Sequence, residues 1–99
     1  NNTGIRMDFI HKKDDELIGS AISKTPIAIF YNINTKKHRN LKIPGGIVRE
    51  IIPYRNMLIY YSHETPNTYL YIVDNKIANV ITKIQVPNRP AGYHTTLLD

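Results

Sequence analysis

The adjacent residues His63 and Glu64 are the pair best suited to chemistry in this 99-residue chain. An imidazole beside a carboxylate can ligate a metal ion or pass protons. A pair of this kind in a polar turn is more often simply solvated, and we favour that interpretation. The other histidines, His11, His38 and His94, do not have the helical two-histidine spacing of a zinc site. Since the chain also contains no cysteine, the sequence indicates no metal site and no cofactor.

A short basic segment could bind phosphate, because clustered cations gain free energy by releasing counterions from a nucleic-acid backbone. Its members are Lys36, Lys37, His38, Arg39 and Lys42. The whole chain carries 13 Lys and Arg against 8 Asp and Glu, a formal net charge of +5. However, lysines on the outermost strand of a sheet commonly prevent edge-to-edge pairing, and we favour that role here. Nucleic acid therefore remains only a weak alternative partner.

Five tyrosines could stack on bases or sugars. They are Tyr60, Tyr61, Tyr69, Tyr71 and Tyr93. Strand alternation places Tyr69 and Tyr71 on one side of a strand and separates Tyr60 from Tyr61. Large flat side chains on both faces of a strand are typical of packing between sheets, so a core role is favoured.

The elements that must position these residues are short β-strands. Runs of β-branched and aromatic residues recur at short intervals between Gly, Pro, Asn and Asp, which is typical of strands and turns. No apolar run is long enough to indicate a membrane span, and no membrane partner is expected. The predicted strands cover Ile5–Ile10, Leu17–Ser23, Ile27–Asn32, His38–Ile43, Ile47–Ile52, Met57–Ser62, Tyr69–Asp74, Val80–Val86 and Tyr93–Leu98.

The chain also repeats itself. Gly4–Ile10 matches Gly46–Ile52, and Gly92–Leu98 begins a third copy, at spacings of 42 and then 46 residues. Thr25-Pro26 and Thr65-Pro66 supply a corresponding turn in each unit. In a similar way Ile29–Asn32 aligns with Ile72–Asn75, and Leu41–Pro44 aligns with Ile84–Pro87.

Four antiparallel strands in about 40 to 45 residues is the spacing of β-propeller blades. We therefore predict an all-β chain of antiparallel four-stranded repeats, with repeat 1 at about 4–45, repeat 2 at about 46–91 and the start of a third at 92–99. Propellers close with roughly four to eight blades. The expectation is either a fragment of a longer parent chain or a two-blade unit that self-associates.

The second unit resembles the YVTN-type family of β-propeller repeats. The residues that carry the resemblance are Tyr71–Asp74, Val80–Val86, Pro90-Ala91-Gly92 and Asp99. They follow the family's order of a strand ending in Asp, a V-x-x-I-x-V-type strand and a Pro-containing turn. The resemblance covers one clear blade and a looser second one, and it implies a propeller fold.

Blade topology gathers one set of turns at the end of a propeller where ligands usually bind. The predicted ligand-binding residues at that end are Lys24, His63, Glu64, Asn67, Asn88 and Arg89. The favoured function is thus a binding or scaffold module whose propeller face presents a site for a protein or a small ligand. The compartment stays open, because neither the cysteine count nor any recognisable segment indicates one.

Two enzymatic alternatives remain. Val48–Tyr61 is similar to the strand hairpin of RelE/ParE-type ribonuclease toxins, in which Arg49 and Arg55 would face RNA. That family requires a helical hairpin ahead of this segment, where Gly19 and Pro26 oppose helix formation. Alternatively, the blades belong to a propeller enzyme, whose active site would draw on further blades.

Overall fold

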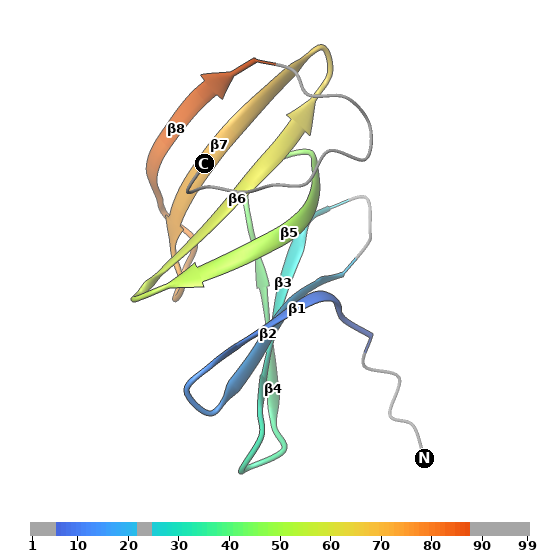
Figure 1. Ribbon diagram of the computed structural model, residues 1–99, viewed down its shortest axis with the longest axis vertical. Helices are drawn as coiled ribbons and strands as arrows, with labels where there is room; N and C mark the ends of the chain where they lie inside the picture. Colours follow the sequence, from blue (N-terminus) through green and yellow to red (C-terminus); the bar gives the residue numbers. More distant parts are fainter. Residues whose placement is uncertain (1–5, 22–24, 88–99) are drawn as a thin grey trace.

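Two four-stranded antiparallel sheets make up the computed structural model, which describes residues 6–21 and 25–87 (Figure 1). The first sheet has the order β1-β2-β3-β4 and the second has the order β5-β6-β7-β8, so each strand pairs with its neighbours along the chain. The bounds are β1 Asp8–Lys13, β2 Glu16–Ala21, β3 Ile27–Asn32, β4 His38–Lys42, β5 Ile47–Tyr54, β6 Met57–Glu64, β7 Asn67–Asp74 and β8 Val80–Val86. The predicted all-β, antiparallel, four-stranded class is confirmed. Among the described residues there is no helix that could cross a membrane.

Most predicted strand positions agree with the structure. The main difference is β1, which runs from Asp8 to Lys13 instead of ending at Ile10. It continues because His11, Lys12 and Lys13 pair with β2 up to a two-residue turn. Similarly, β6 and β7 extend through the polar residues of their connection, since Glu64 pairs directly with Asn67. The predicted strand Tyr93–Leu98 lies outside the described residues.

The first hairpin of each sheet turns in the same way. The β1–β2 and β5–β6 connections both contain two residues, and the first of them has a positive φ, 54° at Asp14 and 56° at Arg55. These two residues are 41 positions apart in the sequence. A left-handed residue reverses the chain tightly, so both hairpins keep a short, fixed register.

The last hairpin also has the same geometry in both sheets. The Asn32 side chain accepts hydrogen bonds from the backbone N–H groups of residues 34 and 35, and Asp74 accepts them from residues 76 and 77. Four residues further on, Lys36 and Ala78 have φ of 62° and 61°. In addition, Asn32 N donates to Lys37 O at 2.9 Å and Asp74 N donates to Asn79 O at 3.0 Å.

These turns define which residues of the two sheets correspond. Asn32 corresponds to Asp74, 42 positions later, and not to Asn75 as the sequence alignment of the third strand predicted. A shift of one residue matters, because it moves every side chain of a strand to the other face of its sheet.

Each sheet has a near face, which points toward the other sheet, and a far face. Strand pairing places Ile18, Ser20, Ala28, Phe30 and Leu41 on the near face of the first sheet, and Leu17, Ile27, Ile29 and Tyr31 on its far face. The near face of the second sheet has Leu58, Tyr60, Ser62, Tyr71 and Val73, and its far face has Ile59, Tyr61, Leu70, Ile72 and Ile84. Both sheets thus carry apolar side chains on both faces.

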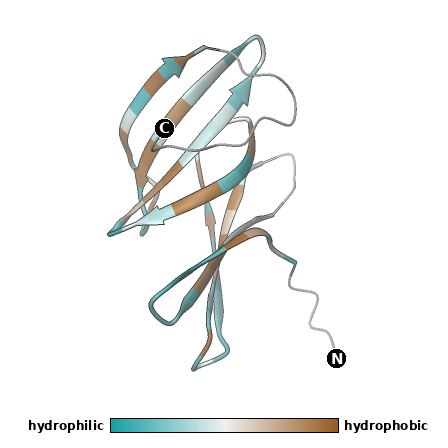
Figure 2. Cartoon of the chain, viewed as in Figure 1, coloured by the Kyte–Doolittle hydropathy of each residue, from teal (hydrophilic) through white to brown (hydrophobic). Residues whose placement is uncertain are grey.

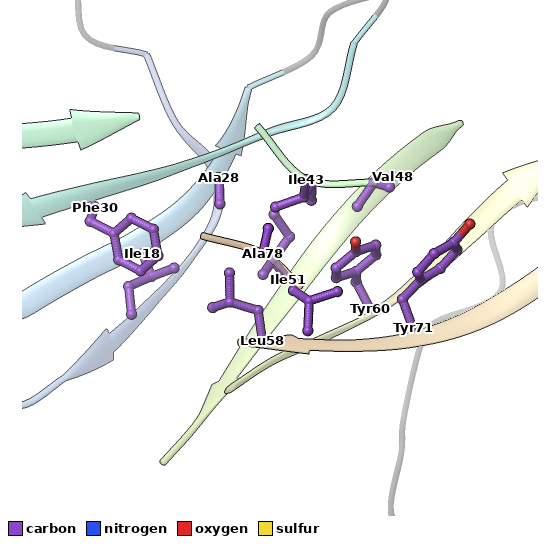
Figure 3. Close-up of a cluster of buried hydrophobic side chains, with 11 residues drawn as sticks. Ile18, Ala28, Phe30, Ile43, Val48, Ile51, Leu58, Tyr60, Tyr71 and Ala78 are labelled. Carbon is purple, nitrogen blue, oxygen red and sulfur yellow. The ribbon is translucent and has the colours of Figure 1, made fainter. Parts of the chain in front are cut away.

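One hydrophobic core joins the two near faces (Figure 3). Tyr60, Phe30, Ile51 and Leu58 are its largest fully buried members, and Tyr71 is also buried in it. Ala78, in the β7–β8 connection, also enters this core. Burying each large side chain contributes roughly 1.5–3 kcal/mol, so the packing of sheet on sheet is a main source of stability.

The backbones of the two sheets approach most closely where β1 and β2 meet β5 (Figure 1). Ser20 Oγ donates to Arg49 O at 2.5 Å, and His11 Nε2 lies 2.8 Å from Glu50 Oε2. At the opposite side, Arg39 Nη2 donates to Asn75 O at 3.0 Å while its guanidinium covers the Phe30 ring at 3.9 Å. These contacts fix the position of one sheet on the other.

Asp74 offers a test of the duplicated turn. The backbone N–H of Ile77, together with those of Lys76 and Asn79, lowers the pKa of this carboxyl below its ordinary value of 3.8. The carboxylate therefore contributes stability above that pH, and the contribution is lost as the pH falls through the folded-state pKa. We expect Asp74→Asn to keep the turn, as Asn32 does. Its free energy of unfolding should fall less steeply than that of the wild type as the pH is lowered. Asp74→Ala should lower stability at neutral pH as well. Urea unfolding from pH 2 to 7 checks both, and equal stability of Asp74→Ala and Asp74→Asn at pH 7 would contradict the duplicated turn.

Candidate binding site at the β6–β7 end

Three of the six predicted ligand-binding residues lie in the described part of the chain, at the β6–β7 turn. These are His63, Glu64 and Asn67; Lys24, Asn88 and Arg89 lie outside the described residues. The linker between the two sheets also reaches this end. Gly46 N donates to Ser62 Oγ at 2.7 Å, and Tyr60 OH donates to Pro44 O at 2.7 Å. The second sheet thus brings a turn and a linker to one edge.

The Pro44-Gly45-Gly46 linker can lie here only because it lacks side chains at two positions. Gly45 has a φ of 133°, and a Cβ there would lie 2.7 Å from Ser62 Oγ. A Cβ on Gly46 would lie 2.6 Å from His63 O. Backbone packed this closely against a strand requires glycine.

His63 and Glu64 do not form a pair. They are consecutive on β6, so their side chains point to opposite faces of the sheet. His63 Nδ1 lies 3.0 Å from Thr68 Oγ1 on the far face. Glu64 lies on the near face, opposite Asn67. Within residues 6–21 and 25–87, no group of three His, Cys, Asp or Glu side chains is arranged to hold a metal ion.

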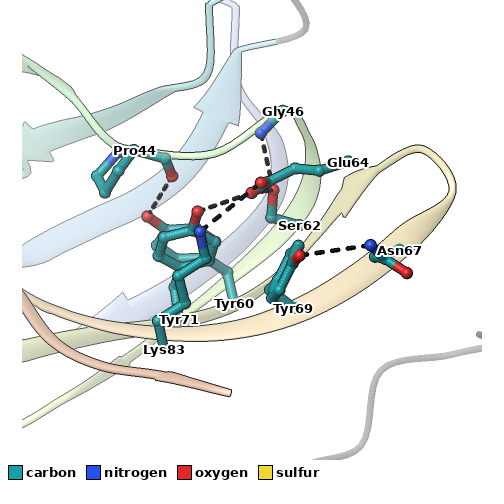
Figure 4. Close-up of polar contacts among 9 residues, drawn as sticks. All are labelled: Pro44, Gly46, Tyr60, Ser62, Glu64, Asn67, Tyr69, Tyr71 and Lys83. Carbon is teal, nitrogen blue, oxygen red and sulfur yellow. Dashed lines mark hydrogen bonds and ion pairs between the residues drawn. The ribbon is translucent and has the colours of Figure 1, made fainter. Parts of the chain in front are cut away.

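The Glu64 carboxylate is the centre of a polar network (Figure 4). Its Oε2 accepts hydrogen bonds from Ser62 Oγ at 2.9 Å and from Tyr71 OH at 2.7 Å. Lys83 Nζ lies 3.9 Å from Oε1. The Glu64 side chain is 28% exposed, so the charge is shielded but still accessible from one side.

Aromatic rings form the wall of this network. The rings of Tyr60 and Tyr71 stack at 5.3 Å with an interplanar angle of 7°. Lys83 Nζ lies 4.4 Å from the centre of the Tyr69 ring and 5.3 Å from that of Tyr71. Lys83 is therefore held by a carboxylate and two rings while remaining near the surface.

The environment changes the proton affinity of three of these groups. Burial raises the pKa of Tyr60 far above its ordinary value, helped by the nearby Tyr71 and Glu64. Burial, followed by the hydrogen bond to Glu64, raises the pKa of Tyr71. The adjacent Tyr71 hydroxyl raises the pKa of Lys83. Lys83 therefore remains a cation and both tyrosines remain neutral hydrogen-bond donors at physiological pH.

A row of amide groups extends the network outward. Gln85 Nε2 donates to Asn67 Oδ1 at 3.1 Å, and Asn67 Nδ2 lies 3.5 Å from Tyr69 OH. Each amide group has hydrogen-bonding capacity beyond these contacts. The cluster thus presents the Lys83 ammonium and the Asn67 and Gln85 amides, which are groups that can bind polar partners.

The sequence alone missed Ser62, Tyr69, Lys83 and Gln85 as members of this site. The period-two pattern of the strands contained part of the signal, because Ser62 pairs with Tyr69, and Tyr71 pairs with Lys83, across neighbouring strands. The core role predicted for Tyr60 and Tyr71 is confirmed by their burial. The basic segment also lies as predicted, with Lys36 and Lys37 exposed beside the edge strand β4.

The Tyr71 hydroxyl tests the network. Because its pKa is raised in the folded state, its contribution to stability is present below pH 10 and is lost as the pH rises through the folded-state pKa. We expect Tyr71→Phe to lower the free energy of unfolding by about 0.5–1.5 kcal/mol at pH 7. Above pH 9 the free energy of unfolding of this variant should decrease less with pH than that of the wild type. Tyr54→Phe, at an exposed position, is the control and should change neither. Denaturant unfolding at pH 7 to 11 measures both effects, and a Tyr71→Phe variant as stable as the wild type at pH 7 would show that the bond to Glu64 is not needed.

Comparison with known proteins identifies no relative of this chain. No protein-family model matches the chain, and no match is found among curated proteins or solved structures.

Proposed function

We propose that this chain is a propeller-type binding module, in which stacked four-stranded sheets form a scaffold and one end of the sheets recognises a protein or a small polar ligand. The observation that carries the proposal is the way in which the two sheets pack. It is a head-to-tail arrangement, as the corresponding residues indicate.

The corresponding residues point in the same direction along the stack. Asp14 corresponds to Arg55, so Ile18 corresponds to Ile59 and Leu17 to Leu58. Ile18 lies on the near face of the first sheet, whereas Ile59 lies on the far face of the second. In a sandwich related by a two-fold axis, both would point inward. Here each sheet turns the same face toward the next, which is the arrangement of propeller blades.

The close approach of β5 to β1 and β2 supports the same proposal. Neighbouring blades are closest at their innermost strands and separate toward the rim. On this proposal β1 and β5 are the innermost strands, while β4 and β8 form the rim. The near-face network of Glu64, Lys83 and Gln85 then lies at one end of the stack, beside the linker.

The polar and aromatic side chains at that end favour a ligand whose own groups can pair with both kinds. Lys83 offers a cation, Glu64 an anion, and Asn67 and Gln85 offer amide donors and acceptors. A peptide backbone with charged side chains presents the complementary set. Protein segments are therefore the ligand class that we favour.

The two enzymatic alternatives receive no support from a specific observation. The strands β1 to β4 lie where a RelE/ParE-type toxin would need its helical hairpin. A propeller enzyme would need catalytic groups, and the described residues of this site present none in a suitable arrangement.

A tandem protein tests the scaffold part of the proposal. Two full copies of the chain, joined by a flexible Gly/Ser linker, should bury the far faces that meet at the junction. We expect the tandem protein at 1 µM to melt at least about 5 °C above the single chain in one cooperative transition. If the tandem protein melts at the same temperature as the single chain, the two copies behave as independent domains and propeller-type packing is refuted.

A peptide library tests the binding part. Random dodecapeptides displayed on phage, selected on the wild-type chain, should yield sequences that lose at least about tenfold in affinity for the double variant Asn67→Ala/Gln85→Ala. An Ile77→Ser variant, altered at an exposed position in the β7–β8 connection, is the control and should bind them as the wild type does. Selected peptides that bind all three proteins equally would place recognition elsewhere on the molecule.

A further inference from the structure

The far face of the second sheet is a large apolar surface that the described residues leave partly open. Ile47 is 60% exposed and Ile84 is 49% exposed, and both lie on this face with Ile59, Leu70 and Ile72. Exposed apolar groups that cluster in this way usually mark an interaction surface. Figure 2 shows hydrophobic segments on β5 and on the outermost strand β8 of this sheet.

This far face corresponds to a surface of the first sheet that another sheet already covers. Residue by residue it corresponds to the near face of the first sheet: Ile59 to Ile18, Leu70 to Ala28, and Ile84 to Leu41. The near face of the first sheet packs on the near face of the second sheet. The required occupant is therefore a surface like the near face of the second sheet.

The chain itself has such a surface. The far face of the first sheet corresponds to the near face of the second, with Leu17 in the place of Leu58 and Tyr31 in the place of Val73. It is apolar too: Leu17, Ile27 and Tyr31 are partly exposed on it, while Ile29 between them is already buried. One chain thus contains both halves of a third interface, at opposite ends of the two-sheet stack.

On the basis of the proposed propeller-type packing, we infer that the far face of the second sheet docks on the far face of the first sheet of a second copy of this chain. The contact is heterologous, because two different surfaces meet. A heterologous contact leaves one copy of each surface free after every addition, so it ends only when a ring closes. With two blades in each chain and four to eight blades in a typical propeller, the closed ring contains about two to four chains.

Complementary surface variants test this inference. Sedimentation velocity of the wild-type chain at 100 µM should give the mass of a closed ring. Ile84→Glu blocks the far face of the second sheet, and Tyr31→Glu blocks that of the first. Each variant alone should sediment as a monomer. An equimolar mixture should form a 1:1 dimer through the two intact surfaces. Ile77→Glu, at a residue that is 68% exposed in the β7–β8 connection, is the matched control and should assemble as the wild type does.

Far-ultraviolet circular dichroism confirms that each variant is folded, and Leu17→Glu replaces Tyr31→Glu if the latter is not. A monomeric wild-type chain at 100 µM overturns the inference. Loss of assembly in Ile84→Glu but not in Tyr31→Glu or Leu17→Glu also overturns it, because the contact would then be symmetric. A monomeric wild type combined with a stabilised tandem protein refutes only docking of a second copy and assigns the far face to further sheets of a longer chain. A tandem protein that is not stabilised refutes the propeller-type packing itself.

Discussion

Each sheet of this protein carries apolar side chains on both of its faces, and the rest of the structure depends on this constraint. A four-stranded sheet with one polar face can be stable against a single partner layer, whereas a sheet with two apolar faces needs a layer on each side. The central strands show this, since β3 has the run Ile27–Tyr31 and β6 has the run Met57–Tyr61, each without a polar interruption on either face. The first and second sheets satisfy the requirement for one face of each. Their far faces are the surfaces on which the proposed docking of a second copy rests.

The specific contacts between the sheets prevent them from sliding on this apolar interface. Hydrophobic packing alone has little directional preference, but Ser20, His11 and Arg39 each reach a polar group of the second sheet. The first two act beside β5 and the third acts at the β7–β8 connection. A contact at each side of the core limits both the translation and the rotation of one sheet relative to the other.

The Glu64 network has two roles, one in the packing of the sheets and one at the end of the second sheet. It holds the Pro44-Gly45-Gly46 linker against β6 through Ser62, and so connects the covalent link between the sheets to the packing of Tyr60 and Tyr71. At the same time it brings Lys83 and the outer amide groups to one end of the second sheet. A site built on three neighbouring strands is rigid, because each of its side chains comes from paired backbone.

Strand positions, turn positions and the four-strand grouping could be read from the sequence, because they depend on local preferences. β-branched and aromatic runs form strands, and Asp, Asn and Gly interrupt them at fixed spacing. The alignment of Asn32 with Asp74 could not be obtained in the same way. It depends on which side chain accepts the backbone hydrogen bonds of the turn. An alignment of Ile and Val residues does not show which side chain that is.

Which faces meet, and which residues surround Glu64, were decided only by the tertiary structure. By itself the sequence determined that Glu64 and His63 lie near a turn. In the fold they point to opposite faces of β6, and the pairing of β6 with β7 and of β7 with β8 brings Tyr71 and Lys83 to Glu64 instead. The physical reason is that register and packing depend on contacts between residues far apart in the chain. The strand pattern is alike on both faces of these sheets, so it leaves the choice of near and far face to the contacts of Ser20, His11 and Arg39 with the second sheet.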